Sequence, residues 1–147
     1  MEIKEYELTD QDLGLEEQEV SEWGERRAAR CILRRGDGIA MLFLEEFGYH
    51  KLPGGGVEEG ESVRQALKRE VKEEVGSTIN IEDEVAKLTS YKTQQATEQS
   101  SIFFLATEKE SGEPEYTEAE QKEGYRPEWH SLDESIKILE SENPSHY

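Results

Sequence analysis

Three glutamates, Glu70, Glu73 and Glu74, follow one another at a spacing that suits the binding of a metal ion. Carboxylate oxygens are the ligands that hard divalent cations such as Mg²⁺ prefer. Side chains at i, i+3 and i+4 meet on one side of a helix, where successive residues are rotated by roughly 100°. If this stretch is helical, the three carboxylates therefore form a candidate cation site.

The residues around the glutamates predict a helix from about Val63 to Val75. Ser62 and Gln65 form a capping box, in which each side chain can bond the backbone N–H of the other. Gly76 ends the helix, because glycine adopts the left-handed conformation without a Cβ clash. The three glutamates therefore lie in the second half of a well-delimited helix.

The glutamates occupy costly positions on this predicted helix. Glu70 and Glu74 fall inside its apolar stripe and Glu73 falls at the edge, where unpaired carboxylates are expensive to bury. Two of them lie in the last turn, where the helix dipole favours cations, and like charges at this spacing repel. A bound cation would offset all three costs. The alternative is a solvated acidic face in a glutamate-rich chain. The stripe consists of Val63, Ala66, Leu67 and Val71.

The segment Gly55–Ser77 resembles the Nudix box, G-x5-E-x7-R-E-U-x-E-E-x-G-U, in which U is apolar. Ser77 departs from this pattern, since an apolar residue is usual there. It follows the helix, so the departure affects a packing contact rather than the chemistry. The matching positions are Gly55, Glu61, Arg69, Glu70, Val71, Glu73, Glu74 and Gly76.

The resemblance implies an enzyme that hydrolyses a nucleoside diphosphate linked to another moiety, by attack of water on phosphorus. Glu70, Glu73 and Glu74 would bind Mg²⁺, or Mn²⁺ in its place, with the Gly54 carbonyl as a further oxygen ligand. Arg69 would orient the carboxylates through charge-assisted hydrogen bonds. Glu70 or a glutamate from a later loop would accept the proton of the attacking water.

Further candidate site residues lie outside the box. In some family members a loop glutamate completes the metal site. Glu123 matches it best, with Glu120 and Glu118 as competitors and a solvated loop as the alternative. Lys51 would either contact a substrate phosphate or face solvent. Tyr91 would either stack on a base or belong to the core.

The substrate is less well defined by the sequence. We expect a nucleoside triphosphate or an oxidised nucleotide, with a dinucleoside polyphosphate or an ADP-sugar as alternatives. The segment Tyr91–Gln94 lacks the proline that ADP-ribose enzymes often have there. A non-catalytic nucleotide-sensing module of the same fold is the alternative of another class, and the complete glutamate set argues against it. His50 is interpreted as a strand residue rather than a catalytic base.

Composition limits the classes of protein to which the chain can belong. It has 147 residues, the size of one domain, and 17 basic against 35 acidic residues give a net charge of −18. This charge argues against a nucleic-acid partner, which requires Lys and Arg on phosphates. The single cysteine, Cys31, excludes an intramolecular disulfide, and no signal peptide or membrane-spanning run is seen. We expect a cytoplasmic protein whose partner is a small-molecule nucleotide, and a homodimer remains compatible.

Hydrophobic patterning predicts a mixed sheet between helices in a single domain, residues 1–147. This agrees with the α/β/α sandwich of the Nudix family. Residues 1–25 are an acidic N-terminal arm expected to pack on the domain, and Trp23 would either anchor it or lie at a dimer contact. The predicted strands are Ile3–Leu8, Arg27–Arg34, Ile39–Glu45, Ile79–Ile81, Val85–Lys92, Ser101–Thr107 and Tyr125–His130.

The remaining segments are predicted as turns, loops and one more helix. Glu82–Glu84 is expected to be a turn between two strands, and Thr93–Gln99 and Glu108–Glu123 to be loops. A last helix runs from Leu132 to about Glu140. Ser131 and Glu134 are expected to form a second capping box at its start.

Overall fold

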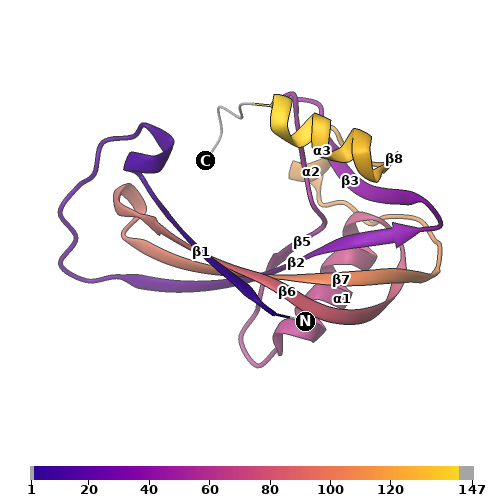
Figure 1. The fold of residues 1–147 in the computed structure, drawn as a ribbon, viewed down its shortest axis with the longest axis horizontal. Coiled ribbons are helices and arrows are strands. Elements are labelled where there is room, and N and C mark those ends of the chain that lie inside the picture. The colour runs from indigo at the N-terminus through magenta and orange to yellow at the C-terminus, as the bar shows by residue number, and fades with distance from the viewer. Residues whose placement is uncertain (1, 143–147) are drawn as a thin grey trace.

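A mixed eight-stranded sheet runs through the protein, with helix α1 on one face and helix α3 on the other (Figure 1). The computed structural model describes residues 2–142. The strand order is β1-β6-β7-β2-β3-β4, with β5 pairing with β2 and β8 with β3. The strands are β1 (Lys4–Thr9), β2 (Gly24–Arg35), β3 (Gly38–Leu44), β4 (Tyr49–Lys51), β5 (Gly54–Gly56), β6 (Thr78–Lys92), β7 (Thr97–Glu110) and β8 (Tyr125–Ser131).

Three helices accompany the sheet, together with two short 3₁₀ turns. The helices are α1 (Val63–Glu74), α2 (Glu118–Lys122) and α3 (Leu132–Ser141), and the 3₁₀ turns are Gln11–Leu13 and Thr93–Gln95. The pairs β1–β6 and β2–β7 are parallel, and the other pairs are antiparallel. None of the helices in residues 2–142 is long and apolar enough to cross a membrane.

The core lies between α1 and the face of the sheet that it covers. Alternate residues of β2 point to this face, and they pack on the apolar stripe of α1 and on β7. Cys31 belongs to this set and is fully buried, as predicted for a small core residue. The fully buried members on these elements include Ala29, Cys31 and Leu33 of β2 and Leu67 and Val71 of α1.

The capping box at the start of α1 and the left-handed glycine after its end are confirmed. Ser62 Oγ accepts a hydrogen bond from the Gln65 N–H at 3.1 Å, and Gln65 Oε1 accepts one from the Ser62 N–H at 2.8 Å. Gly76 has a φ of 89°, in the left-handed region. The helix ends at Glu74, one residue earlier than predicted, because Val75 acts as its C-terminal cap.

The prediction of a turn at Glu82–Glu84 is wrong. Thr78–Lys92 is one continuous strand, β6, whose register with β7 shifts between Ile81 and Glu84 and again between Glu84 and Ala86. A bulge absorbs extra residues without reversing the chain. Acidic side chains can therefore face solvent from within the strand.

The two predicted loops are shorter than expected. β7 begins at Thr97 and extends to Glu110, so the β6–β7 hairpin closes over Thr93–Ala96. Within the second predicted loop, Thr117 and Glu120 form a capping box that starts the short helix α2. The T-x-x-E pattern was a readable signal that sequence analysis missed.

The last helix agrees with prediction except at its cap. Ser131 Oγ accepts a hydrogen bond from the Glu134 N–H at 3.1 Å, which is half of a capping box. The Glu134 carboxylate instead lies 3.6 Å from His130 Nδ1.

The N-terminal arm lies along the outer edge of the β6–β7 hairpin. The buried Asp10 carboxylate accepts hydrogen bonds from the N–H and the hydroxyl group of Thr93. The backbone N–H of Gln18 donates to the same hydroxyl group at 2.9 Å. Trp23 packs edge-on against Tyr91, with 5.9 Å between ring centroids.

Candidate functional site

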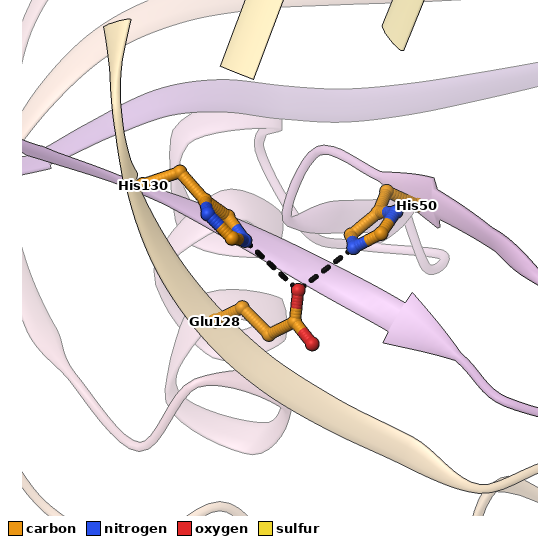
Figure 2. Close-up of side chains that lie close together, drawn as sticks. All are labelled: His50, Glu128 and His130. Atoms are coloured by element: carbon orange, nitrogen blue, oxygen red, sulfur yellow. Dashed lines mark hydrogen bonds and ion pairs between the residues drawn. The ribbon is translucent and has the colours of Figure 1, made fainter. Parts of the chain in front are cut away.

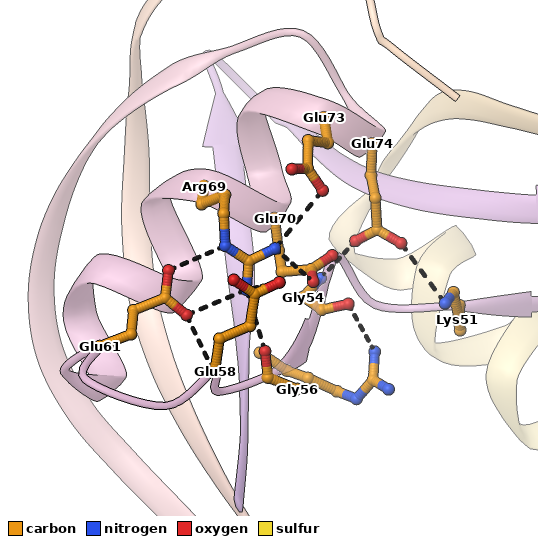
Figure 3. Close-up of polar contacts among 10 residues, drawn as sticks. Lys51, Gly54, Gly56, Glu58, Glu61, Arg69, Glu70, Glu73 and Glu74 are labelled. Carbon is orange, nitrogen blue, oxygen red and sulfur yellow. Dashed lines mark hydrogen bonds and ion pairs between the residues drawn. The ribbon is translucent and has the colours of Figure 1, made fainter. Parts of the chain in front are cut away.

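The glycine strand β5 lies beside the second half of α1 (Figure 3). A Cβ on this strand would collide with β2 at Gly54 and with α1 at Gly55. Gly54 has a φ of 138°, and a Cβ there would lie 2.0 Å from the Ala29 carbonyl oxygen. A Cβ on Gly55 would lie 2.6–2.8 Å from the carboxylate atoms of Glu70. Glycine at these positions allows the backbone to reach the carboxylates, and the Gly54 N–H donates to Glu74 Oε1 at 2.8 Å.

Arg69 connects the carboxylates of this segment to one another (Figure 3). It forms two hydrogen bonds with Glu61, of 2.8 and 3.0 Å, and a third with the Gly56 carbonyl oxygen at 3.0 Å. Its Nη1 donates to Glu70 Oε1 at 2.9 Å and lies 3.5 Å from Glu73 Oε2. This geometry fits a residue that orients carboxylates rather than one that contacts substrate.

The pair of bonds from Arg69 fixes Glu61 as an ionised architectural residue. The Arg69 hydrogen bonds, with a further bond from the Glu58 N–H, lower the pKa of Glu61 to about 2. Glu61 and Glu58 thereby close the loop that precedes α1. Arg69 is thus held from the loop side and presents its remaining N–H groups to the metal-ligand candidates.

Glu74 is the most buried of the three box glutamates, with its side chain 2% exposed. Burial raises the pKa of Glu74 to about 7, although the Lys51 ammonium group and the Gly54 N–H both act to lower it. Burial thus outweighs the partners that this carboxylate has within the protein. A further cation close to Glu74 would favour its ionised form.

Lys51 lies beside Glu74 rather than in open solvent. Its Nζ atom is 3.4 Å from Glu74 Oε2 and 5.0 Å from the centre of the Tyr125 ring. The sequence suggested that Lys51 contacts a substrate phosphate or faces solvent, and neither alternative included an ion pair with Glu74. Lys51 therefore supplies a positive charge at the edge of the carboxylate cluster.

Glu73 is more exposed than its neighbours, and α2 approaches it from one side. Burial and the neighbouring Glu70 carboxylate raise the pKa of Glu73, Arg69 lowers it, and Glu120 of α2 raises it further. Glu123 instead adds to the raised pKa values of two tyrosines on β4 and β8, and Glu74 and Glu120 also raise the pKa of the second. Of the loop glutamates, Glu120 contributes to the shift of Glu73. The two tyrosines are Tyr49 and Tyr125.

The donor set of the box consists of oxygens, which fits Mg²⁺ or Mn²⁺. The carboxylates of Glu70, Glu73 and Glu74 are held by Arg69, the Gly54 N–H and Lys51 rather than gathered around one point. The Gly54 carbonyl oxygen accepts a hydrogen bond from Arg30 at 3.3 Å. Outside the box, His50, Glu128 and His130 have ligand atoms that all lie within 4.8 Å of one another. Within residues 2–142, this is the one group of three His, Cys, Asp or Glu side chains gathered so closely.

Two sequence candidates lie away from the α1–β5 contact. Tyr91 lies near the end of β6, against Trp23. Glu118 begins α2 and is exposed. Sequence analysis assigned no chemical role to His50, and no local spacing links it with residues about eighty positions later.

The NUDIX domain family model matches residues 24–147. A curated relative, "Uncharacterized Nudix hydrolase YvcI" of Bacillus subtilis, is 39% identical over 54 residues. This match covers 37% of the chain and 34% of the relative, so about a third of that protein is matched.

Solved structures of hydrolases share the fold. A NUDIX hydrolase from Nitrosomonas europaea aligns with a TM-score of 0.65 and 20% identity, over 80% of this chain and 79% of its own. A MutT NUDIX hydrolase from Burkholderia pseudomallei has a TM-score of 0.56 and 26% identity, over 75% and 85% of the two chains. An ADP-ribose pyrophosphatase from Streptococcus suis has a TM-score of 0.55 and 24% identity, over 74% and 75%. The predicted α/β/α sandwich is confirmed.

Proposed function

The chain belongs to the NUDIX domain family, and from this premise we propose that it hydrolyses a nucleoside diphosphate-linked compound with the help of Mg²⁺. Mn²⁺ would serve in its place. The observation that carries the proposal is the buried Glu74 carboxylate. It is held against the glycine strand beside two further glutamates, with a pKa raised to about 7. A binding module that did not use a metal ion would have no need of this arrangement.

Glu70, Glu73 and Glu74 would hold the ion, with the Gly54 carbonyl oxygen as a further donor. When bound, Mg²⁺ neutralises charge on the pyrophosphate and lowers the pKa of water. Arg69 holds Glu70 and Glu73 in place through its hydrogen bonds and is itself fixed by Glu61.

A carboxylate must also take the proton of the attacking water. Glu70 would accept it at the end of α1, or a loop glutamate would do so. Glu120 is favoured by its electrostatic effect on Glu73, and Glu123 by its place in the sequence. Positioning and electrostatics account for most of phosphoryl transfer, so no covalent nucleophile is required.

Three cations on the sheet favour a substrate with several phosphates. The side chains of Arg26, Arg30 and Lys92 lie close enough that burial, and then the charges of the two arginines, lower the pKa of Lys92. Arg30 also donates to the carbonyl oxygens of Leu52 and Gly54, so this basic group borders the glycine strand. A concentration of positive charge is notable in a chain of net charge −18.

We favour a nucleoside triphosphate or an oxidised nucleotide, although the basic group would suit any substrate with several phosphates. The names of similar structures, MutT and ADP-ribose pyrophosphatase, keep an ADP-sugar as an alternative, and a dinucleoside polyphosphate is another. Lys51 would stabilise a phosphate beside Glu74, and Tyr91 remains a proposed base contact. Residues 1–147 would form one domain of a cytoplasmic enzyme that acts alone or as a homodimer.

The test is hydrolysis of a nucleotide panel in Mg²⁺, with identification of the phosphate products. We expect Glu73→Gln and Glu74→Gln each to reduce kcat by orders of magnitude while the far-UV circular dichroism stays unchanged. The exposed Glu110→Gln, the same change outside the site, should retain the activity of the parent.

Two outcomes would contradict the proposal. Near-normal turnover in both variants would remove the box glutamates from the reaction. Tight nucleotide binding by the parent without any product would favour the nucleotide-sensing module instead.

A further inference from the structure

A second group of potential metal ligands, His50, Glu128 and His130, lies where β4, β8 and α3 meet (Figure 2). It belongs to the other face of the sheet from Glu74. His50 and Lys51 are neighbours on β4, so their side chains point to opposite faces. Lys51 reaches Glu74 of α1, whereas His50 reaches Glu128 and the end of α3. The two clusters are thereby separated by the sheet.

The second group has the geometry of a metal site. His50 Nε2 lies 2.7 Å and His130 Nε2 lies 2.9 Å from the same oxygen, Glu128 Oε1. The side chains of His50, His130 and Glu128 are 12%, 23% and 24% exposed. Strand pairing sets this arrangement, because Glu128 and His130 are two residues apart on β8 and therefore share a face.

Each histidine also has a carboxylate beside its other ring nitrogen. His50 Nδ1 lies 2.6 Å from Glu142 Oε2, and the other oxygen of Glu142 accepts the His50 backbone N–H at 2.7 Å. His130 Nδ1 lies 3.6 Å from Glu134 Oε2. Metal-bound histidines usually donate their second N–H to a carboxylate in this manner, which fixes the ring and its tautomer.

The hydrogen-bond inventory of His50 is satisfied either by a doubly protonated ring or by a bound metal ion. Both of its ring nitrogens face carboxylate oxygens, which accept but do not donate, and a neutral imidazole has only one N–H. A metal ion between His50, His130 and Glu128 would bind both Nε2 lone pairs. Each Nδ1–H would then remain for its outer carboxylate.

We propose that His50, Glu128 and His130 bind a transition-metal ion of the Zn²⁺ class, with Glu142 and Glu134 orienting the two imidazoles. Two imidazole nitrogens and one carboxylate suit Zn²⁺ or Co²⁺ and do not suit Mg²⁺. Bonds of about 2.0–2.1 Å in tetrahedral geometry place ligand atoms about 3.3 Å apart. The two histidine nitrogens, now 2.7 and 2.9 Å from Glu128 Oε1, would each need to move away from that oxygen by about half an ångström. The fourth position is open to water.

Such an ion would tie α3 to the sheet. His50 comes from β4, Glu128 and His130 from β8, and the two outer carboxylates from α3 and the residue that follows it. Metal binding to the folded state alone stabilises that state by mass action. We therefore expect Zn²⁺ to raise the thermal unfolding midpoint.

The test is a Co²⁺ titration of protein without a histidine tag, in excess Mg²⁺ so that carboxylate-only sites are filled. A single equivalent of Co²⁺ should produce the visible absorption of a four-coordinate site, and Zn²⁺ should displace it. His50→Gln and His130→Gln should each abolish this absorption. Glu142→Gln should weaken binding by about ten- to a hundredfold, as for other outer carboxylates.

Two matched variants separate this site from others. His146→Gln changes the third histidine of the chain, which lies outside the described residues, and should leave the Co²⁺ spectrum intact. Glu73→Gln alters the box and should do the same. Equal Co²⁺ binding by the parent and His50→Gln, or loss of binding in Glu73→Gln, would overturn the proposal.

A folding defect can also be distinguished from loss of the site. Glu142→Gln leaves the three proposed metal ligands unchanged. For this variant, the thermal unfolding midpoint without metal is the reference for the midpoint with metal. At limiting Zn²⁺, the ion should raise the thermal unfolding midpoint of Glu142→Gln less than that of the parent. Equal increases would show that Glu142 does not orient His50 for metal binding.

Discussion

The buried carboxylate of Glu74 determines how the box responds to protons and to cations. In water its pKa would be 4.5, and burial raises it to about 7. Lys51 and the Gly54 N–H compensate for only part of the lost hydration. The residue is therefore poised to exchange a proton for a metal ion close to neutral pH.

This shift predicts a pH dependence of stability in metal-free protein. Between about pH 4.5 and 7 the folded state binds more protons at Glu74 than the unfolded state, so the free energy of unfolding falls as the pH rises through this window. The shift corresponds to at most about 3 kcal/mol. Urea unfolding in EDTA at several pH values measures it.

Glu74→Gln is the control for this prediction, because glutamine cannot titrate. The difference in unfolding free energy between parent and variant should change over the window in EDTA, and it should change less in Mg²⁺. A constant difference from pH 4.5 to 7 would show that the burial of Glu74 does not shift its pKa.

Individual residues also show which parts of the candidate sites could be predicted from the sequence. The box positions on α1 could be predicted because their spacing is local. The departure at Ser77 has a structural reason that the sequence did not reveal. Ser77 is buried, and its hydroxyl group donates at 2.5 Å to Glu108, which also accepts two bonds from Arg35. The cluster around His50 could not be predicted, because strand pairing alone brings its members together.

Among the secondary-structure elements, the contact between β5 and α1 is the one on which the proposed active site depends. The two elements can approach because Gly55 presents no side chain to Glu70. The colliding atoms would be the end of a flexible side chain rather than backbone. A small substitution at Gly55 should therefore displace a carboxylate without unfolding the protein.

We expect Gly55→Ala to reduce nucleotide hydrolysis by at least about tenfold, because a misplaced catalytic group costs about one to two orders of magnitude. Its thermal unfolding midpoint should stay close to that of the parent. Steady-state kinetics in Mg²⁺, with circular dichroism on the same samples, give both quantities.

Gly56→Ala is the matched control for this experiment. Its added methyl group would meet the end of the Arg26 side chain at 3.0 Å instead of a metal-ligand candidate. Because Arg26 belongs to the proposed phosphate-binding group, any effect of Gly56→Ala should appear in KM rather than in kcat. Equal losses of kcat in the two variants would mean that the strand as a whole, rather than the carboxylate of Glu70, is sensitive to substitution.

Prediction of the elements succeeded where local signals determine structure. The caps of α1 follow from residues within a few positions of its ends. The bulge in β6 could not be predicted, because the acidic run Glu82–Glu84 is compatible both with a turn and with a solvent-facing irregularity. Only pairing with β7, some twenty residues later, decides between them.

Across the whole molecule, negative charge is in large excess, with 35 acidic against 17 basic residues. Mutual repulsion of these charges opposes the compact state. Added salt screens such repulsion over distances longer than the Debye length, which is about 10 Å at 0.1 M and about 3 Å at 1 M.

The thermal unfolding midpoint of metal-free protein should therefore rise as NaCl increases from about 0.01 M to about 0.5 M at pH 7. This salt-induced rise of the unfolding midpoint should be smaller near pH 4.5, the isoelectric point, where the net charge is close to zero. Differential scanning calorimetry in EDTA measures both series. A salt response of equal size at the two pH values would point to ion-specific effects rather than to charge repulsion.

The parallel pairing of β1 with β6 has a consequence for self-association. β6 is fifteen residues long and would otherwise offer unsatisfied backbone donors and acceptors to a neighbouring copy. β1 covers six of these positions, and its own outer border carries Lys4, Glu5 and Glu7, which disfavour a further strand. We therefore expect the N-terminal arm to disfavour edge-to-edge pairing of β6 with a second copy.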